Sequence, residues 1–488
     1  MKFTRAVAVV FLLVALTYAY FYQDPGANGN TRLALTMAIV KEGRLNVDTF
    51  NSVAGGYSSG DIAFYQGKYY TDKAIGSSIL GAVVYYPIYT ILHLFGQELS
   101  VPDERHILTF LVIGLPSAVV AALMFMVCEY LSKSRFRSYI VTLAISLGTM
   151  CFPFSIVYFG HQLAASLLFG AFFLIFQIKT QPDPVKIKNF PIFLVGLLLG
   201  LAFITDLTTA VIVLPLVVYY FYVLWTRKLI KQVAPWVIPA LGGLIPILLM
   251  VAYNFLVFGT PFASGYQYLV DPIFRAGMAK GIMGIGRPNW HVLFYETLHP
   301  AQGIFWQSPV LIMAGVGGFF MLRKKQVWPE LALAAIACVA YLLLNAGYFM
   351  WWGGWSFGVR QIIPMLPFLC LPLIFVPKKI FPLVIGLTFI SVAQMVIVAA
   401  SNVRIPDEYF VKIAQLGFFE YSAIYSNCLQ KLISGNFAWN LGQALFSLKN
   451  WASLLPISVT ILAATLFMAF SPTRLDRSHQ NQVERLVS

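Results

Sequence analysis

Residues 6–22 read AVAVVFLLVALTYAYFY, an apolar run without a charge that stops at Gln23-Asp24-Pro25-Gly26. A helix of this length can cross most of the ~30 Å hydrocarbon core of a bilayer. Runs of 17 to 25 mostly apolar residues recur along the rest of the chain. The sequence therefore predicts an all-α polytopic membrane protein, with Asp24 at the mouth of its first span.

The composition and the cysteines agree with this class. Hydrophobic residues make up 59% of the 488 residues and charged residues 11%, and the mean hydropathy is +0.77, which lies outside the range of soluble domains. The five cysteines are scattered without a CxxC pair or a Cys/His cluster, which argues against a disulfide framework or a zinc site. Because no small-residue cleavage site follows residues 6–22, we expect an uncleaved first span.

The formal net charge of +14 is distributed unevenly. When the charged residues are sorted by predicted loop, the whole excess falls on one set of loops, and the remaining segments are neutral in sum. The positive-inside rule makes the basic loops cytoplasmic, so the charge sets topology and needs no nucleic-acid partner. The basic loops contain Lys2/Arg5, 133–137, 179–188, 227–231, 323–325, 378–379 and 474–485.

We expect the apolar stretch 77–95 not to cross the membrane. If it crossed, Met1 and Lys133 would lie on opposite sides, against the charge rule. Its Pro87, His93 and tyrosines suit the membrane interface. The sequence then predicts about twelve spans with both termini cytoplasmic: 6–22, 107–131, 138–152, 156–178, 190–206, 207–225, 233–258, 305–322, 328–349, 361–376, 380–400 and 452–470.

The first outer loop, 23–106, is too long and too aromatic to be a simple connector. We expect an amphipathic helix from an N-cap at Asn30 to Gly43, resting on the membrane with Arg32 at a polar end. An irregular but ordered loop follows over 55–76. The chain is divided into a membrane-embedded core that includes this loop (1–400), a last outer loop (401–451), and a final span with a cytoplasmic tail (452–488).

Other outer segments carry further candidate site residues. His161 and Asp206 lie in short turns between spans, and a charge such as that of Asp206 in an apolar hairpin is costly unless it has a partner or a function. Arg360 follows the tryptophan-rich segment MWWGGWSFGV. Three residues of the loop 259–304 do not have a spacing typical of metal sites: His291, Glu296 and His299.

Four segments and the position of Asp24 resemble a known family. They are KYYTDKAIGSSILGAVVYYP (68–87), SLGTMCFPFSIVYFGHQLAASLLFGAFF (146–173), GLAFITDLTTAVIVLPL (200–216) and GGWSFGVRQIIPMLPFL (353–369). The layout is similar to that of the membrane-embedded C-type glycosyltransferases, in particular the family-39-like members related to protein O-mannosyltransferases and aminoarabinose transferases. The resemblance covers most of the chain, through short motifs.

This resemblance implies a sugar donor linked to polyprenyl phosphate and an extracytoplasmic glycan, lipid or protein acceptor, at the surface of a bacterial-type cell membrane. In this family an acid of the first outer loop acts on the acceptor, and basic outer residues hold the phosphate. Carried over, Asp24 is the general base, and Lys73 and Arg360 contact the phosphate. Many members have paired acids where Asp24 stands alone, so a divalent cation stays an open alternative and no metal ligands are assigned.

Each assignment has a plainer alternative. Asp24-Pro25-Gly26 would form a simple turn, and Asp61 would cap another turn. Asp72 and Lys73 would form a solvated pair. His161 would be a packing residue, Asp206 would make a structural hydrogen bond, and Arg360 would anchor the chain at the interface. The predicted substrate-binding residues are Asp72, Lys73, His161, Asp206 and Arg360. The rival functional class is a polytopic transporter or lipid flippase, which usually has repeats or charges near mid-membrane, and a third is a non-catalytic scaffold.

Overall fold

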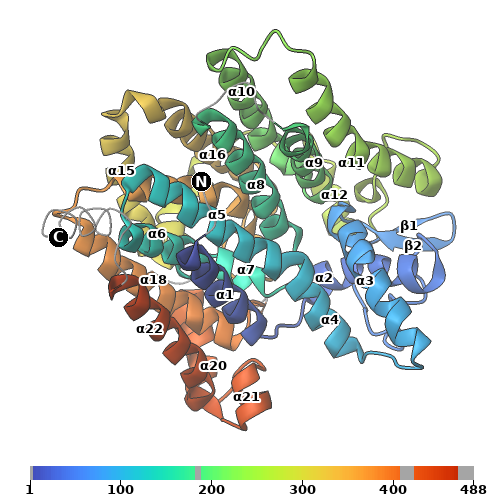
Figure 1. Ribbon diagram of the computed structural model, residues 1–488. Coiled ribbons are helices and arrows are strands. Elements are labelled where there is room, and N and C mark those ends of the chain that lie inside the picture. The colour runs from blue at the N-terminus through green and yellow to red at the C-terminus, as the bar shows by residue number, and fades with distance from the viewer. Residues whose placement is uncertain (1–3, 182–187, 407–421, 471–488) are drawn as a thin grey trace, which may run out of the picture.

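The computed structural model describes residues 4–181, 188–406 and 422–470, which Figure 1 shows as a helical bundle. Within these residues the strands are limited to one antiparallel hairpin, β1 (Ile62–Tyr65) and β2 (Lys68–Thr71). The predicted cytoplasmic tail beyond residue 470 and residues 407–421 of the last outer loop lie outside the described part. The all-α polytopic class is confirmed.

Every predicted span falls on a helix or a short series of helical segments. By length and composition, eight helices of the described part can cross a membrane, and four shorter apolar helices accompany them. The elements at the predicted spans are α1 (Arg5–Tyr20), α4–η2–α5 (Val101–Ser132), α6 (Arg135–Gly148), α8 (Gly160–Thr180), α9 (Asn189–Thr205), α10 (Ala210–Thr226), α11 (Ala234–Phe258), α15 (Ile312–Leu322), α16 (Trp328–Ala346), η8–α17–η9 (Arg360–Phe375), α18 (Phe381–Ser401) and α22 (Leu455–Phe470).

Helix α3 (Gly76–Leu94) is one of the eight helices that are long enough to span. Its first turn is held to the first outer loop, because Arg32 donates to Ser77 Oγ at 3.0 Å. Further along, Tyr85 donates to Glu104 at 2.5 Å, at the start of the next helix. These contacts hold α3 against the rest of the first outer loop. That α3 lies along the outer surface and does not cross the membrane stays a prediction.

Glycines allow α9 and α11 to pack closely beside the hairpin. A Cβ atom on Gly196 would come within 1.7 Å of the Pro239 carbonyl, and one on Gly242 within 2.2 Å of the Phe193 carbonyl. Small residues let membrane helices approach in this way. Figure 1 shows the pair next to α12 (Pro272–Met278) and the β1–β2 hairpin, so it supports one side of the outer loops.

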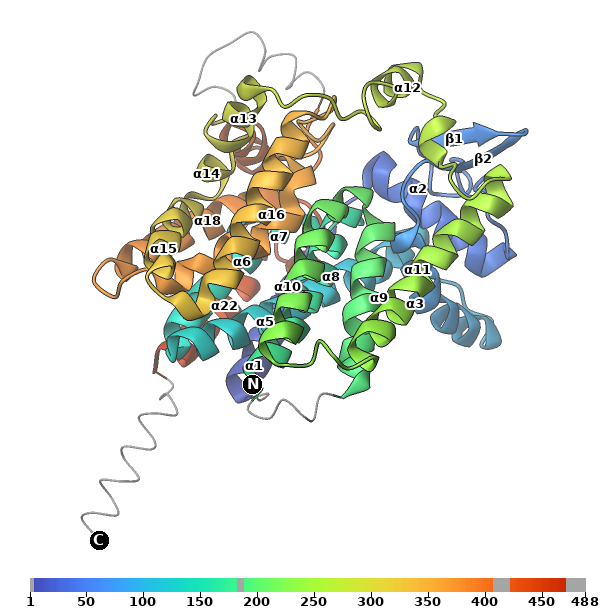
Figure 2. The ribbon, with the colours of Figure 1, turned by 90° about the horizontal axis from the view of Figure 1, so that it is seen from above.

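The basic loops of the sequence meet one another in the fold. Lys179 pairs with the buried Glu330 at 2.6 Å, and Lys324 lies 5.5 Å from the centre of the Phe375 ring. Figure 2 shows the start of α1 at one end of the bundle, and the hairpin, α12 and α13 (Trp290–Thr297) at the other end. The structure thus gathers loops that the charge count assigned to one side.

The helix of the first outer loop begins earlier than the sequence predicts. Helix α2 (Gly26–Met37) continues as the π-helical turn η1 (Ala38–Glu42) and ends at Gly43, whose φ is +64°. The predicted N-cap at Asn30 is wrong, because Asp24 Oδ1 already accepts from the Gly26 N–H at 2.7 Å. Asn30 lies inside the helix and donates to the Ser58 carbonyl at 3.0 Å.

Two further expectations for this loop are wrong. The segment 55–76 is not wholly irregular, since it contains the β1–β2 hairpin around Gln66-Gly67, both with positive φ, as two-residue hairpin turns require. Helix α2 is buried over most of its length, unlike the expected amphipathic helix with Arg32 at a polar end. That side chain is buried, because backbone and side-chain acceptors of the next segment satisfy its donors.

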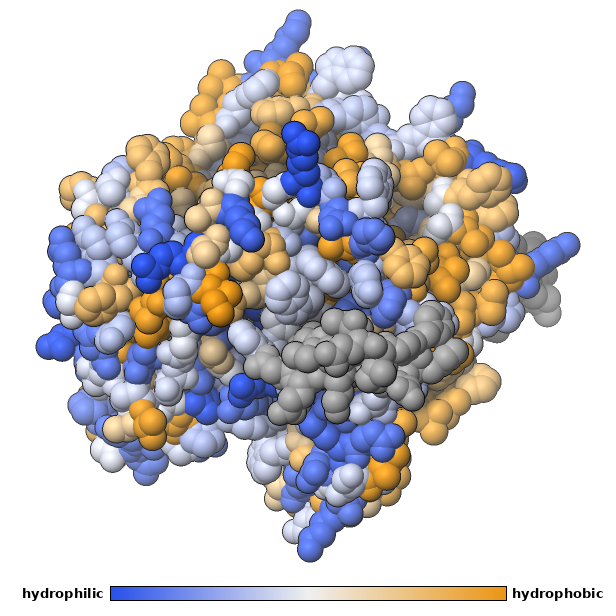
Figure 3. Space-filling view, turned by 180° about the vertical axis from the view of Figure 1, so that it is seen from behind, coloured by the Kyte–Doolittle hydropathy of each residue, from blue (hydrophilic) through white to orange (hydrophobic). Residues whose placement is uncertain are grey.

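Apolar side chains remain exposed along several helices, as lipid contact requires. Examples on α10 are Leu214 and Val218, which are 66% and 68% exposed. Figure 3 shows the opposite face from Figure 1, on which apolar and hydrophilic residues are interspersed. Apolar side chains therefore form a large part of the surface.

Candidate active site

A cavity of about 420 Å³ lies between α2, the first outer loop, the outer ends of α8, α10 and α16, and the loops around 266–285 and 348–361. Its ionisable lining groups come from segments far apart in the sequence. They are Arg32, Asp61, Asp72, Lys73, His161, Asp206, Arg360 and Arg404. All five predicted substrate-binding residues are among them, so the structure brings these together.

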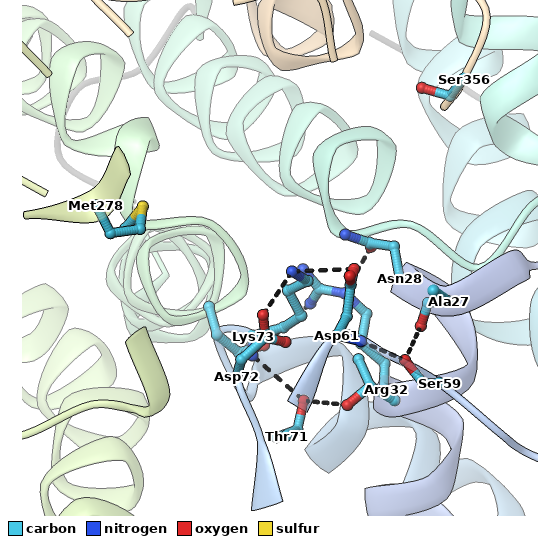
Figure 4. A network of polar contacts seen from close by, with 12 residues as sticks. Ala27, Asn28, Arg32, Ser59, Asp61, Thr71, Asp72, Lys73, Met278 and Ser356 are labelled. Carbon is cyan, nitrogen blue, oxygen red and sulfur yellow. Dashed lines mark hydrogen bonds and ion pairs between the residues drawn. The ribbon is translucent and has the colours of Figure 1, made fainter. Parts of the chain in front are cut away.

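Lys73 is the centre of the first polar group in the cavity. Its Nζ lies 3.1 Å from Asp61 Oδ2 and 2.8 Å from Asp72 Oδ2, as Figure 4 shows. Burial alone would lower the pKa of Lys73, but the two carboxylates raise it above its usual range. The lysine is therefore firmly charged.

The two carboxyl groups beside Lys73 differ. Burial would raise the pKa of Asp61, but Lys73 holds it below its ordinary value. For Asp72, burial raises the pKa and the charge of Asp61 adds to this, although Lys73 opposes both. The Asp61 side chain is 18% exposed and that of Asp72 4%. Asp61 is thus the more accessible carboxylate, and the buried Asp72 forms an ion pair with Lys73.

Arg32 of α2 fixes the position of this group. Its Nη1 donates to the Ala74 carbonyl and to Ser77 Oγ, both at 3.0 Å, and its Nε donates to Asn28 Oδ1 at 3.3 Å. The guanidinium therefore ties the segment after Lys73 to the helix that follows Asp24. Sequence reasoning missed this role because it placed Arg32 only at a polar end of an amphipathic helix.

His161 and Asp206 form a second buried pair. His161 Nδ1 lies 2.6 Å from Asp206 Oδ2, and Asp206 Oδ1 accepts from the backbone N–H and the hydroxyl of Thr208 at 3.1 and 2.7 Å. The Thr208 hydroxyl also bonds to Tyr341 at 3.1 Å, which links the short turn η4 (Leu207–Thr209) to α16.

Close packing explains why this pair forms. Gly160 begins α8, and a Cβ atom there would lie 3.0 Å from the Thr205 carbonyl and 3.2 Å from Arg32 Nη1. With no side chain at Gly160, the start of α8 can approach the end of α9. Asp206 ends α9 and caps the short helical turn that leads into α10, so its carboxylate faces the neighbouring histidine.

Arg360 lies on the other side of the cavity. Its Nη1 donates to Ser356 Oγ at 3.0 Å, and its guanidinium lies 4.8 Å from the centre of the Phe159 ring. Arg360 takes part in none of the ion pairs formed within the described residues, and its buried Nε has no hydrogen-bond partner there. A guanidinium in this state can bind an anion through two N–H groups.

The tryptophan-rich loop before Arg360 has an unusual backbone. Gly353, Gly354 and Gly358 all have positive φ, between +65° and +89°, which glycine adopts without strain. The loop carries Trp355 to the cavity wall, where its ring meets that of Phe274 from α12 edge-on at 5.9 Å between centroids. The glycines thus fold the loop tightly over the cavity.

Much of the remaining cavity wall is apolar. It includes side chains from α10, α16 and the two loops that follow α11 and α16. An amphiphile with a small charged head and an apolar body fits such a lining. The apolar lining residues include Leu207, Val211, Leu269, Ile285, Leu344 and Phe349.

Asp24, the predicted base, does not line the cavity. Its side chain is exposed, and its Oδ1 accepts from the Gly26 N–H, whereas the next residues, Pro25 and Gly26, do line the wall. The Arg404 side chain packs over Gly26, 3.1 Å from the site of an added Cβ atom. The contacts of Asp24 are therefore those of a turn and helix cap.

The carboxylates of the cavity do not form a metal site. Within the described residues no group of three His, Cys, Asp or Glu side chains is arranged to hold a metal ion. Between Asp61 and Asp72, where a divalent cation would bind, lies the ammonium of Lys73. The residues present therefore do not fit a cation at this position.

Comparison with known proteins gives similar structures only. No family model matches the chain, and no curated protein matches its sequence. The chain is similar to the crystal structure of ArnT from Cupriavidus metallidurans in the apo state, at 14% identity and a TM-score of 0.47, over 95% of this chain and 75% of that one.

A second structure of the same protein, bound to undecaprenyl phosphate, is similar at 13% identity and a TM-score of 0.46, with the same coverage of both chains.

Proposed function

We propose that this protein is a membrane glycosyltransferase that moves a hexosyl or pentosyl group from polyprenyl phosphate to an acceptor hydroxyl. The acceptor is a glycan, lipid or protein at the extracytoplasmic surface of a bacterial-type cell membrane, and both termini are cytoplasmic. The positive-inside rule supports this orientation, since the basic loops lie away from the cavity.

The observation that carries the proposal is the unpaired guanidinium of Arg360 in a cavity that combines charged groups with many apolar side chains. Arg360 donates to Ser356 and lies over Phe159, with no carboxylate partner among the described ion pairs. Val211 and Leu344 line the same cavity. A phosphate joined to a prenyl chain would meet the guanidinium with its head and these side chains with its body.

The proposed reaction is a direct displacement. The acceptor oxygen attacks the anomeric carbon while the bond from that carbon to the phosphate oxygen breaks, with inversion of configuration. Arg360 stabilises the charge that develops on the leaving phosphate, because preformed donors in a water-poor site act strongly there. Lys73 holds its charge between Asp61 and Asp72 and faces the same space.

Asp61 is the acid of the first outer loop that best fits contact with the acceptor. The resemblance gives this role to Asp24, but Asp24 is exposed and Asp61 lines the cavity. We therefore propose that Asp61 accepts a hydrogen bond from the acceptor hydroxyl and orients its oxygen. Asp24 as the general base stays a prediction of the resemblance, and no contact of its side chain supports it.

The test uses the purified full chain in lipid nanodiscs with a panel of undecaprenyl-phosphate-linked hexoses and pentoses. Release of undecaprenyl phosphate, detected by mass spectrometry, is measured with and without an envelope extract as the acceptor. We expect release from at least one donor, stimulated by the extract. Absence of release from every donor would contradict the proposal, and passage of intact donor across vesicles would favour the transporter class.

A further inference from the structure

The pair of His161 and Asp206 is built as an oriented base and has no part in the reaction described so far. Asp206 Oδ2 meets His161 Nδ1 at 2.6 Å, and both of its oxygens are engaged, since Oδ1 accepts twice from Thr208. An ionised Asp206 places the ring proton on Nδ1. The other ring nitrogen, Nε2, then carries the free lone pair, in a side chain that lines the cavity.

We propose that His161, oriented by Asp206, is the general base of the glycosyl transfer; this inference rests on the proposed function. As the acceptor oxygen bonds to the anomeric carbon, its proton moves to His161 Nε2. The bond between the anomeric carbon and the phosphate oxygen breaks, and its electron pair stays on the phosphate. The proton then passes to the released phosphate monoester or to water, which restores the neutral ring.

The charges of the cavity support this assignment. Four cations and three carboxylates line it, which leaves one positive charge in excess while His161 is neutral. A polyprenyl phosphodiester carries one negative charge, whereas the monoester that leaves has a second pKa near 6 and approaches two charges at neutral pH. A proton held on His161 supplies the matching charge as the second negative charge develops.

The carboxylates of the cavity are poorer candidates for the proton acceptor. Lys73 holds the pKa of Asp61 below its ordinary value, and a more acidic carboxyl group is a weaker base. The Asp72 side chain is only 4% exposed, and Figure 4 shows it beside Lys73 with Asp61 nearer the open space. Asp61 can still accept a hydrogen bond and orient the acceptor.

Charged groups of both signs act on His161. Asp206 favours the protonated ring, whereas Arg32 of α2 and Arg360 at the start of η8 oppose it. The two guanidinium groups thus favour the neutral ring before reaction. Donor phosphate bound at Arg360 would screen part of this repulsion, so the ring becomes a better proton acceptor when the donor is present.

The experiment compares the wild type with His161→Gln and Asp206→Asn, as full chains in nanodiscs. We follow the release of undecaprenyl phosphate between pH 5 and 9, with a donor that the wild type uses. A third variant, His161→Ala, is assayed with and without added imidazole. We expect the wild-type rate to fall at acid pH as the histidine is protonated. His161→Gln should be slower by about 10²- to 10⁴-fold. Its rate should no longer fall at acid pH, so the acid limb of the pH profile is lost.

Two further readouts separate catalysis from structure. Asp206 is a positioning residue, so Asp206→Asn should lower the maximal rate and shift the pH at which the rate falls on the acid side. His161→Ala should regain activity when imidazole is added. Binding of undecaprenyl phosphate to His161→Gln should stay within about twofold of the wild type, because the proposed phosphate contacts are elsewhere. His93→Gln, an exposed histidine outside the cavity, is the matched control.

The outcomes are distinct. If His161→Gln keeps the wild-type acid limb, or if it is inactive and imidazole restores nothing to His161→Ala, the assignment of the base is wrong while the proposed function stands. If the wild type itself releases no undecaprenyl phosphate, the proposed function fails first. Loss of the acid limb or rescue by imidazole supports His161 as the base.

Discussion

The Lys73 ammonium lies 3.1 Å from the Asp61 carboxylate, with Asp61 just before the first strand of the hairpin and Lys73 just after the second. The β1–β2 ladder sets this distance, because Ile62 pairs with Thr71 across it. The hairpin therefore determines the distance between these two side chains, which both line the cavity.

Asp61→Asn tests the role of this pair in the acceptor step. The amide removes the negative charge that orients the acceptor hydroxyl, so we expect the KM for the acceptor to rise at least tenfold while the acid limb of the pH profile remains. The measurement is release of undecaprenyl phosphate at varied acceptor concentration. Asp24→Asn is the matched comparison and should stay within about twofold of the wild type, whereas loss of activity in that variant would restore Asp24 as the base.

Arg360→Ala should weaken the binding of undecaprenyl phosphate by about 30-fold or more, since a buried charged hydrogen-bonded contact contributes about 2 kcal/mol or more. Arg360→Lys keeps the charge but cannot bind the phosphate in the bidentate manner of a guanidinium, so an intermediate loss of affinity is expected. Titration of the purified chain with the lipid gives the affinities. Arg287→Ala, at an exposed arginine outside the cavity, should bind like the wild type, and equal loss in both alanine variants would contradict the assignment.

Glu104→Gln should destabilise the outer layer by about 2 kcal/mol, because hydrogen bonds to a buried charge contribute about 1.5–3 kcal/mol each. The carboxylate accepts from Lys41 at 2.6 Å and from Tyr57 and Tyr85 at 2.5 Å. Thermal unfolding in detergent measures the change. Glu98→Gln, an exposed control on the same loop, should change stability by less than about 0.5 kcal/mol, and an equal effect of the two variants would rule out this role of Glu104.

Glu296 makes stability depend on pH. Burial raises its pKa from 4.5 to about 8, against the lowering effect of the Asn345 hydrogen bond. Below about pH 4.5 both folded and unfolded chains hold the proton, and between about 4.5 and 8 only the folded chain does, so stability falls as pH rises. Glu296→Gln should melt higher than the wild type at pH 8 and lose this part of the pH dependence. A variant less stable than the wild type at pH 8 would contradict the argument.

The turn after α3 tests the predicted topology. A single cysteine at Glu98, in a chain whose native cysteines are replaced, should react with a membrane-impermeant maleimide added to intact cells. A cysteine at Lys325, in a predicted cytoplasmic loop, should react only after the cells are opened. Protection of position 98 in intact cells, together with labelling after lysis, would show that 77–95 crosses the membrane.

The helices could be predicted from the sequence because each span is a long apolar run and the basic loops alternate with it. The segment at 305–322 is apolar except for Gln307 and Ser308. The structure divides it at these residues into α14 (Ile304–Gln307), followed by a short 3-10 turn and α15. The start of α2 was missed because Asn30 is a better N-cap residue by preference than Pro25. The side chain of Asp24 caps the turn from two residues upstream, which favours the earlier start.

The site was harder to predict. Asp206 was singled out because a charge in an apolar hairpin is costly, and Lys73 and Arg360 because the resemblance implies phosphate contacts. Their neighbours in the cavity were not singled out, since Asp61 resembles an ordinary turn residue and Arg32 a polar residue at a helix end. The hairpin carried a local signal in Gln66-Gly67 between two aromatic strands. The pairing of His161 with Asp206 depends on the packing of α8 against α9, and nothing in the sequence alone determines that contact.

The most direct test of the central claim is a cryo-electron microscopy structure of the full chain in nanodiscs with undecaprenyl phosphate. The account predicts phosphate density within hydrogen-bonding distance of the Arg360 guanidinium, near Lys73, and prenyl density along the apolar wall that includes Val211 and Leu344. Phosphate density at another site, with the cavity around Arg360 filled only by water, would contradict it.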